Sequence, residues 1–116
     1  MSDLSAKIRD IPDFPKRGIV FKDIMPLLAD PEALHETVEQ LAGFAERRKP
    51  DVILGAEARG FILGAALAYR LNCGFVAARK PGKLPWRTVS AKYALQYGFD
   101  ALELHADAST SGARVL

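Results

Sequence analysis

The sequence has little cysteine, no long apolar run and almost no net charge, and each absence excludes a class of protein. Cys73 is the only cysteine, so the chain has no internal disulfide and no cage of thiolate metal ligands. No stretch approaches the roughly 18 consecutive apolar residues of a membrane span, and the charged N-terminus has no apolar leader. The formal net charge is +2, which gives no general argument for nucleic acid or membrane binding. We therefore expect an unsecreted, cytoplasmic protein.

The composition is that of a globular protein with one core. The chain has 116 residues, of which 49% are hydrophobic and 26% are charged, so we expect residues 1–116 to form a single domain. His35 and His105 have no partners at metal-ligand or triad spacing, and we expect both at the surface. Cys73 is predicted to be a small buried hydrophobic residue. No metal site built from side chains is visible in the sequence.

The middle of the chain alternates helix and strand signals. Asp30 and Pro31 form a helix start, and apolar residues then recur at helical spacing, which predicts a helix over 31–48. Short apolar runs at 52–54 and 75–78 flank an amphipathic helix over 60–71. A strand, a crossover helix and a second strand make a parallel pair. The sequence thus predicts an α/β fold with a parallel sheet.

The two ends of the chain carry different patterns. Prolines in the segment 10–15 disfavour helix, so we expect an irregular entry segment there. Apolar and polar residues alternate over 89–97 and again near 102–104, which indicates an antiparallel hairpin. A hairpin of this kind is free to act as a flap over a site at the edge of the sheet. Residues 114–116 are typical of a beginning strand.

Two charged turns follow the two predicted parallel strands. In GAEARGF (55–61) the turn leads into a helix N-terminus, whose free N–H groups and dipole favour an anion, and Arg59 adds a cation. In ARKPGKLP (78–85) the cations are Arg79, Lys80 and Lys83. Because neighbouring parallel strands end close together, these cations can converge beside the same helix start. Phosphate or pyrophosphate is the expected ligand. The alternative is that both turns are solvated charged loops without a ligand.

Two further segments allow both a binding and a packing interpretation. In DFPKRGIVFKDI (13–24), Phe21 is able to stack on a flat heterocycle, whereas the alternative is an apolar segment packed on the core. In SAKYALQYG (90–98), Tyr93 and Tyr97 share one face of a strand, and most such pairs serve packing.

Taken together and in this order, these segments resemble the adenine phosphoribosyltransferase family. The motifs are PDFPKRGIVFKDI, GAEARGFILGAALAYRL, RKPGKLP, TVSAKYALQYG and LELHADA, which extend over nearly the whole chain. The resemblance implies a type I phosphoribosyltransferase fold, a parallel sheet with flanking helices and an antiparallel hairpin flap. It also implies the conversion of adenine and phosphoribosyl pyrophosphate into AMP and pyrophosphate, with Mg²⁺ bound through the pyrophosphate of the substrate.

The resemblance assigns roles to particular residues. In the N-terminal strap (1–28), backbone groups of Val20 and Lys22 would read the adenine edge while Phe21 stacks on the ring. Glu57, Ala58 and Arg59 would form the pyrophosphate loop, with a cis peptide expected at Glu57–Ala58. Cations at three positions would clamp the pyrophosphate, partly from a neighbouring subunit of a homodimer; they are Arg79, Lys80 and Lys83.

The hairpin flap (80–106) would close over the reacting centre. The hairpin around Gln96 and Tyr97 would carry out this closure, and these two residues with Arg59 are the expected catalytic residues. Gln96 stands where the family usually has Glu, so a charge is replaced by a neutral amide. The chain also ends where a segment resembling VDDLLATGGT is expected, and we therefore expect a marginally stable or associating chain with at most trace transferase activity.

Two alternative functions stay open at this point. One is a noncatalytic phosphoribosyltransferase-like module that binds nucleotide or regulates a complete enzyme. The other is a related transferase for a different base, against which the adenine-type segment around Phe21 argues.

Overall fold

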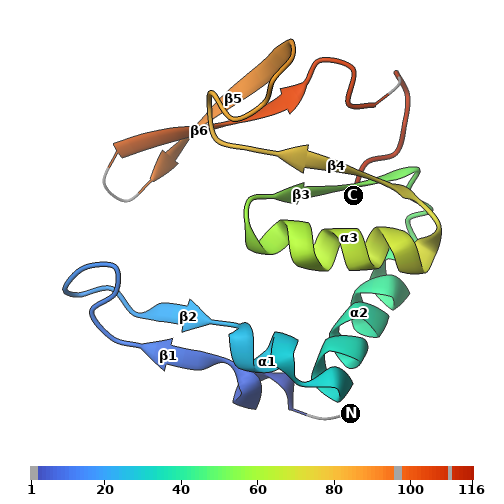
Figure 1. The fold of residues 1–116 in the computed structure, drawn as a ribbon. Coiled ribbons are helices and arrows are strands. Elements are labelled where there is room, and N and C mark those ends of the chain that lie inside the picture. Colours follow the sequence, from blue (N-terminus) through green and yellow to red (C-terminus); the bar gives the residue numbers. More distant parts are fainter. Residues whose placement is uncertain (1–2, 96–97, 110) are drawn as a thin grey trace. The chain divides into compact units, whose positions relative to one another are not determined.

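The computed structural model describes residues 3–95, 98–109 and 111–116. The chain divides into two compact units, Met1–Leu41 and Ala42–Leu116, and each is described by itself. The elements are η1 (Leu4–Lys7), β1 (Arg9–Ile11), β2 (Phe21–Asp23), α1 (Met25–Ala29), α2 (Pro31–Glu46), β3 (Val52–Ala56), α3 (Arg59–Leu71), β4 (Gly74–Ala78), β5 (Thr88–Leu95) and β6 (Gly98–His105) (Figure 1).

The first unit contains a small hairpin where the sequence predicts an irregular segment. Strands β1 and β2 pair antiparallel, with Ile11 opposite Phe21. In the connecting loop, the Asp13 carboxylate accepts the Gly18 N–H at 2.9 Å, and Gly18 has a left-handed φ of 87°. Glycine adopts that conformation without steric cost. Three-residue strands carry too few alternations for a periodicity argument, which is why the pattern missed them.

The helices of the first unit begin at polar side chains that precede them. The Asp23 carboxylate accepts the Met25 N–H at 2.9 Å, and the Asp30 carboxylate accepts the Glu32 N–H at 3.1 Å. Asp30 also pairs with Lys7 at 2.8 Å. The Lys7 ammonium lowers the pKa of Asp30, and the carboxylate in turn raises the pKa of Lys7. The start of α2 at Pro31 agrees with the predicted capped helix start.

The second unit is built on the predicted parallel pair. Strands β3 and β4 pair in parallel from Val52↔Gly74 to Ala56↔Ala78, and α3 connects them. The predicted strand at 114–116 lies on the other side of β3, where Val115 forms a parallel bridge with Val52. Its backbone bonds include Leu54 N–H to the Leu116 carbonyl at 2.8 Å. Strand β3 therefore has a partner on each side.

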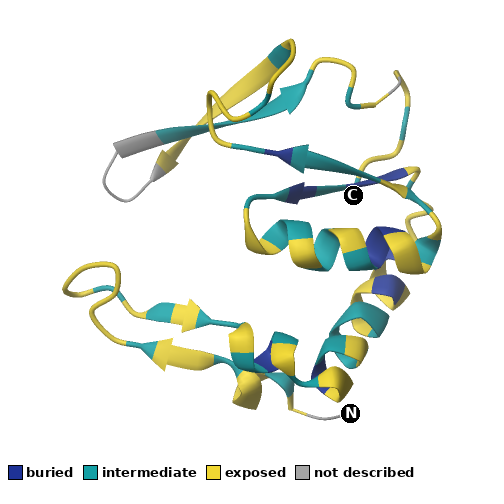
Figure 2. Ribbon diagram, viewed as in Figure 1, coloured by how far each residue is buried: buried dark blue, intermediate teal, exposed yellow. Residues whose placement is uncertain are grey.

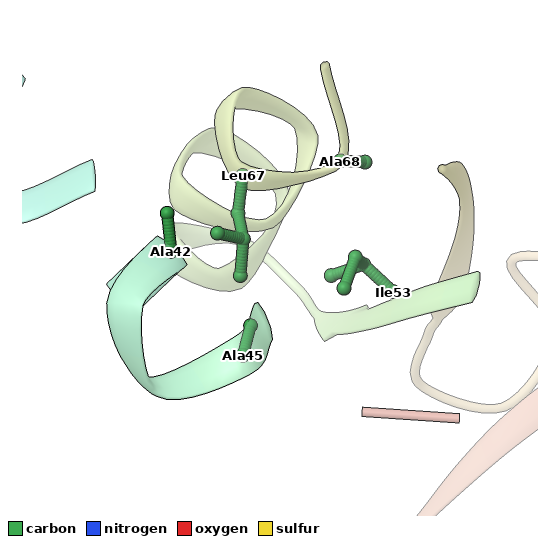
Figure 3. Packing of buried hydrophobic residues seen from close by; sticks show 5 residues of the cluster. All are labelled: Ala42, Ala45, Ile53, Leu67 and Ala68. Atoms are coloured by element: carbon green, nitrogen blue, oxygen red, sulfur yellow. The ribbon is translucent and has the colours of Figure 1, made fainter. Parts of the chain in front are cut away.

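The core of this unit lies where α3 and the end of α2 meet the sheet. Figure 3 shows its buried members, which are Ala42, Ala45, Ile53, Leu67 and Ala68. Alanines on α2 face the longer Ile53 and Leu67 side chains, so the helix backbone approaches closely. Cys73 packs against this cluster but is half-buried rather than buried as predicted.

Glycines allow α3 to approach the sheet closely at the strand-to-helix turn. A Cβ added at Gly55 would collide with the Gly60 carbonyl oxygen and would lie 2.8 Å from the Phe75 ring. A Cβ at Gly64 would also lie 2.8 Å from that ring. Because these two residues are glycines, the first turn of α3 is able to lie this close to β3.

The hairpin β5–β6 is antiparallel, with Thr88 opposite His105. Strand β5 is exposed over 89–94, whereas β6 is half-buried over 100–105, and Figure 2 shows this contrast. His105 is less exposed than the sequence predicted. Its ring is half-buried and lies edge to face with Trp86 at 6.3 Å, because Trp86 and β6 come together. His35, by contrast, is exposed as predicted.

None of the helices in the described part of the chain is both long and apolar enough to cross a membrane.

Candidate functional site

The candidate site begins where two parallel strands end at the same level. Ala56 and Ala78 are paired as the last residues of β3 and β4. Glu57 and Arg79 therefore leave the sheet side by side, and the Glu57 N–H still bonds to the Ala78 carbonyl at 3.0 Å. This edge, at the carboxyl ends of the strands, is where open α/β sheets hold ligands.

The Glu57 carboxylate turns toward the chain that follows β4. Its Oε1 accepts the backbone N–H of Lys80 at 2.7 Å and lies 3.5 Å from Arg79 Nε. The Arg79 contact is a charge contact only, since Nε is shielded from solvent but makes no hydrogen bond with correct geometry among the described residues. Glu57 is 18% exposed and Arg79 is 35% exposed, so water screens the pair only in part.

These contacts keep Glu57 ionised. The Lys80 N–H is the main cause that lowers the pKa of Glu57, while partial burial opposes it. The charges of Arg79, Lys83 and Lys80 lower the pKa further. Because the charge of Lys83 acts on the carboxylate, all three predicted cations of the basic loop lie within electrostatic range of Glu57.

The same loop is attached at its far end to the hairpin. The Glu103 carboxylate accepts the Gly82 N–H at 2.9 Å and bonds to Thr88 Oγ1 at 3.2 Å. The backbones of Arg79 and Glu103 also exchange two hydrogen bonds, at 2.9 and 2.7 Å. Lys80 Nζ lies 3.6 Å from Asp100. The loop is therefore held between the sheet edge and β6.

The helix start beside this loop has no side-chain cap. Helix α3 begins at Arg59, and its N-cap residue Ala58 makes no side-chain hydrogen bond to the first turn. The Glu57–Ala58 peptide is cis, as the family resemblance implies. Arg59 is exposed. A helix N-terminus favours an anion through the positive end of its dipole.

The first unit holds the residues expected to bind a base. Phe21 lies edge to face with Phe14, with ring centres 5.2 Å apart. Lys22 Nζ pairs with Asp10 at 2.6 Å. Val20 is 54% exposed. Among the described strands, β2 pairs only with β1.

The predicted site residues thus fall into three groups. Glu57, Ala58, Arg59, Arg79, Lys80 and Lys83 lie on two adjacent turns of the second unit, whereas Val20, Phe21 and Lys22 lie in the first. Gln96 and Tyr97 lie outside the described residues. Sequence reasoning missed Glu103 and Asp100, whose contacts with the basic loop depend on the path of β6. Their only signal was the polar–apolar alternation of that strand.

The donor set does not supply a metal cage. Among the described residues, no three side chains of His, Cys, Asp or Glu gather as metal ligands. The carboxylate nearest the candidate anion site, that of Glu57, already contacts Lys80 and Arg79.

Comparison with known proteins shows the family. No family model matches the chain. The adenine phosphoribosyltransferase of Syntrophotalea carbinolica is 57% identical over 116 residues, which are all of this chain and 68% of that protein.

Solved structures agree with the sequence relatives. The adenine phosphoribosyltransferase of Thermoanaerobacter pseudethanolicus superposes with a TM-score of 0.91 at 56% identity, covering 97% of this chain and 65% of that one. The Saccharomyces cerevisiae enzyme, complexed with an imino-altritol bisphosphate and adenine, gives a TM-score of 0.85 at 35% identity over 97% of this chain and 66% of that one.

The chain spans about two thirds of the length of these relatives. The identity extends over the whole chain, and the α/β architecture with a parallel sheet and a hairpin is shared with the solved structures. The chain belongs to the adenine phosphoribosyltransferase family, a family of pentosyltransferases with the type I phosphoribosyltransferase fold.

Proposed function

We propose that this chain carries the adenine- and diphosphate-binding parts of a purine-salvage transferase. The reaction converts adenine and phosphoribosyl pyrophosphate into AMP and pyrophosphate. The observation that supports it most is the convergence of Arg79 and Lys80 on Glu57 at the sheet edge, beside the N-terminus of α3. Family membership supplies the substrates for this site.

The diphosphate of the substrate binds at the turn of the second unit. The backbone N–H of Ala58 and the backbone and side chain of Arg59 approach it from the helix start. The side chains of Arg79, Lys80 and Lys83 supply the remaining positive charge. Magnesium binds with the diphosphate and neutralises part of its charge.

Adenine binds at the strap of the first unit. Phe21 stacks on the ring, and backbone groups of Val20 and Lys22 contact its edge, which suits a flat heterocycle with alternating donors and acceptors. The edge-to-face contact with Phe14 fixes the Phe21 ring and leaves less rotamer entropy to lose on binding. A structurally similar yeast enzyme is complexed with adenine, which supports this choice of base.

The reaction requires positive charge near the departing pyrophosphate and exclusion of water from the reacting centre. Displacement at the anomeric carbon builds negative charge on the departing pyrophosphate, and the cations with Arg59 stabilise that charge. Closure of the hairpin excludes water that would compete with adenine, and Gln96 and Tyr97 take the catalytic roles that the resemblance implies. Gln96 contributes hydrogen bonds rather than a charge. The protein is cytoplasmic and acts as a homodimer in this proposal.

Calorimetry on single variants tests the two binding parts separately. Lys83→Ala is expected to weaken inorganic pyrophosphate binding about tenfold, because a charge-assisted contact is lost. It should leave adenine binding unchanged, whereas Phe21→Ala should weaken adenine binding and not pyrophosphate binding. Lys92→Ala removes a cation from the exposed strand β5 and serves as the matched control.

The outcomes separate the candidate functions. Binding of both ligands together with AMP formation supports the transferase. Binding of both without AMP formation assigns this chain to the noncatalytic module. Tighter binding of another purine than of adenine would contradict the proposed base, and equal pyrophosphate affinities of Lys83→Ala and Lys92→Ala would contradict the proposed anion site.

A further inference from the structure

The basic segment, residues 79–83, carries three cations within five residues. We propose that Glu57 and Glu103 are positioning residues, which hold this segment in the conformation that presents its cations to a diphosphate. The inference rests on the proposed function, and it assigns to Glu57 a role through its side chain that differs from direct substrate binding.

Glu57 holds the N-terminal end of the basic segment. Its carboxylate accepts the Lys80 N–H at 2.7 Å, so a side chain after β3 fixes the backbone direction two residues after β4. The same oxygen lies 3.5 Å from Arg79 Nε. The carboxylate therefore fixes a backbone group through a hydrogen bond and lies in charge contact with a guanidinium.

Glu103 holds the C-terminal end of the basic segment. One carboxylate oxygen accepts the Gly82 N–H at 2.9 Å, and the other lies 3.2 Å from Thr88 Oγ1. Gly82 has a left-handed φ of 83°, so the turn between Pro81 and Lys83 has a conformation that few other residues tolerate. The bond from Glu103 stabilises this turn and thereby sets where Lys83 leaves it.

The charge arrangement gives a physical reason for these two carboxylates. Three neighbouring cations repel one another, and an unsupported loop carrying them would adopt many conformations. Ionised carboxylates at both ends reduce that repulsion, and the low pKa of Glu57 keeps its charge in place at neutral pH. The basic segment then loses less conformational entropy when an anion binds, which raises its affinity for the anion.

The sign of a mutational effect separates positioning from simple electrostatics. A carboxylate beside an anion site repels the anion, so its removal should tighten binding if charge alone decides. If the carboxylates position the segment, Glu57→Ala and Glu103→Ala should weaken inorganic pyrophosphate binding, by about tenfold for one lost charge-assisted hydrogen bond. Adenine affinity should not change.

Conservative and control variants sharpen this test. Glu103→Gln keeps an oxygen that accepts the Gly82 N–H, so it should restore most of the affinity that Glu103→Ala loses. Asp107→Ala removes an exposed carboxylate just beyond the hairpin and should leave pyrophosphate binding unchanged. Tighter binding in both alanine variants, or equal loss in Glu103→Gln and Glu103→Ala, would overturn the proposal.

Amide hydrogen exchange gives a readout that needs no ligand. In the wild-type chain the N–H groups of Lys80 and Gly82 should be protected by their carboxylate acceptors. Glu57→Ala should speed exchange at Lys80 and Glu103→Ala at Gly82, while the amides of β3 keep their rates. Unchanged exchange at both positions would overturn the proposal. A wild-type chain that binds no pyrophosphate would contradict the proposed function, and exchange would still decide whether the carboxylates hold the segment.

Discussion

The parallel pair β3–β4 and the antiparallel hairpin β5–β6 are neighbours in the second unit, joined where Arg79 and Glu103 bridge. They differ in what they bury. Ile53 on β3 is 3% exposed, whereas Val89 on β5 is 56% exposed. The parallel pair contacts α3 and the core, while the outer strand of the hairpin faces solvent over 89–94.

This difference separates a buried scaffold from a hairpin whose outer strand is largely exposed. The register of β3 and β4 is fixed because their side chains are packed in the core. The buried pair therefore fixes the direction in which Glu57 and Arg79 leave the sheet. The hairpin is held mainly by its own ladder and by contacts of β6 with the basic segment. Elements with few buried apolar contacts open at low free energy, as a flap requires.

The largest expected effect contrasts one buried and one exposed apolar residue. Ile53→Ala should lower the free energy of unfolding by about 3 kcal/mol, because it leaves a cavity in the core. Val89→Ala should change it by less than about 0.5 kcal/mol, since the side chain is largely exposed. Urea denaturation monitored by circular dichroism measures both. Equal losses would show that the hairpin contributes to the same packed core.

A second contrast concerns glycines in the scaffold. Gly55→Ala should lower the free energy of unfolding by about 2 kcal/mol, because its methyl group would meet the Gly60 carbonyl and the Phe75 ring. Gly43→Ala, on an exposed face of α2 with no atom near the added methyl group, should raise it by about 0.5 to 1 kcal/mol. A Gly55→Ala variant as stable as the wild type would contradict the close approach of α3 to β3.

The smallest expected effect is the pH dependence at the boundary between scaffold and hairpin. The pKa of Glu57 is lowered in the folded chain, so its stabilising contribution is present above its ordinary value of 4.5 and is lost as the pH falls through the folded pKa. As the pH is lowered from 5 into strongly acidic solution, the free energy of unfolding of Glu57→Gln should therefore fall less than that of the wild type. Thermal unfolding across this range measures the difference, with Asp107→Asn as the control. Parallel curves for wild type and Glu57→Gln would contradict the pKa shift.

The sequence predicted the scaffold better than its surroundings. The predicted helix over 31–48 is α2 (Pro31–Glu46), and the strand at 52–54 extends to Ala56. These elements are long or strongly apolar, so periodicity identifies them. The hairpin of the first unit and helix α1 were missed because they are short. His105 was misjudged because burial by Trp86 is a tertiary contact that spacing does not encode.

The sequence predicted which two turns lie at the sheet edge but not the contacts between them. The order of strand, helix and strand was sufficient to bring Glu57 and Arg79 to one sheet edge. It could not show that the Glu57 carboxylate accepts the Lys80 N–H, or that Glu103 reaches Gly82. These contacts depend on how two turns and a hairpin pass one another, and side-chain hydrogen bonds of this kind leave no periodic trace. The roles of Val20, Gln96 and the other site residues stay predictions.

The register of β3 and β4 also limits how chain length can vary among relatives. Since Ala56 pairs with Ala78, one residue inserted into either strand would turn every following side chain to the opposite face and shift one charged turn past the other. Insertions and deletions should therefore collect at the tip of the β5–β6 hairpin and in the turn over 106–113, while the 22-residue interval from Ala56 to Ala78 keeps its length.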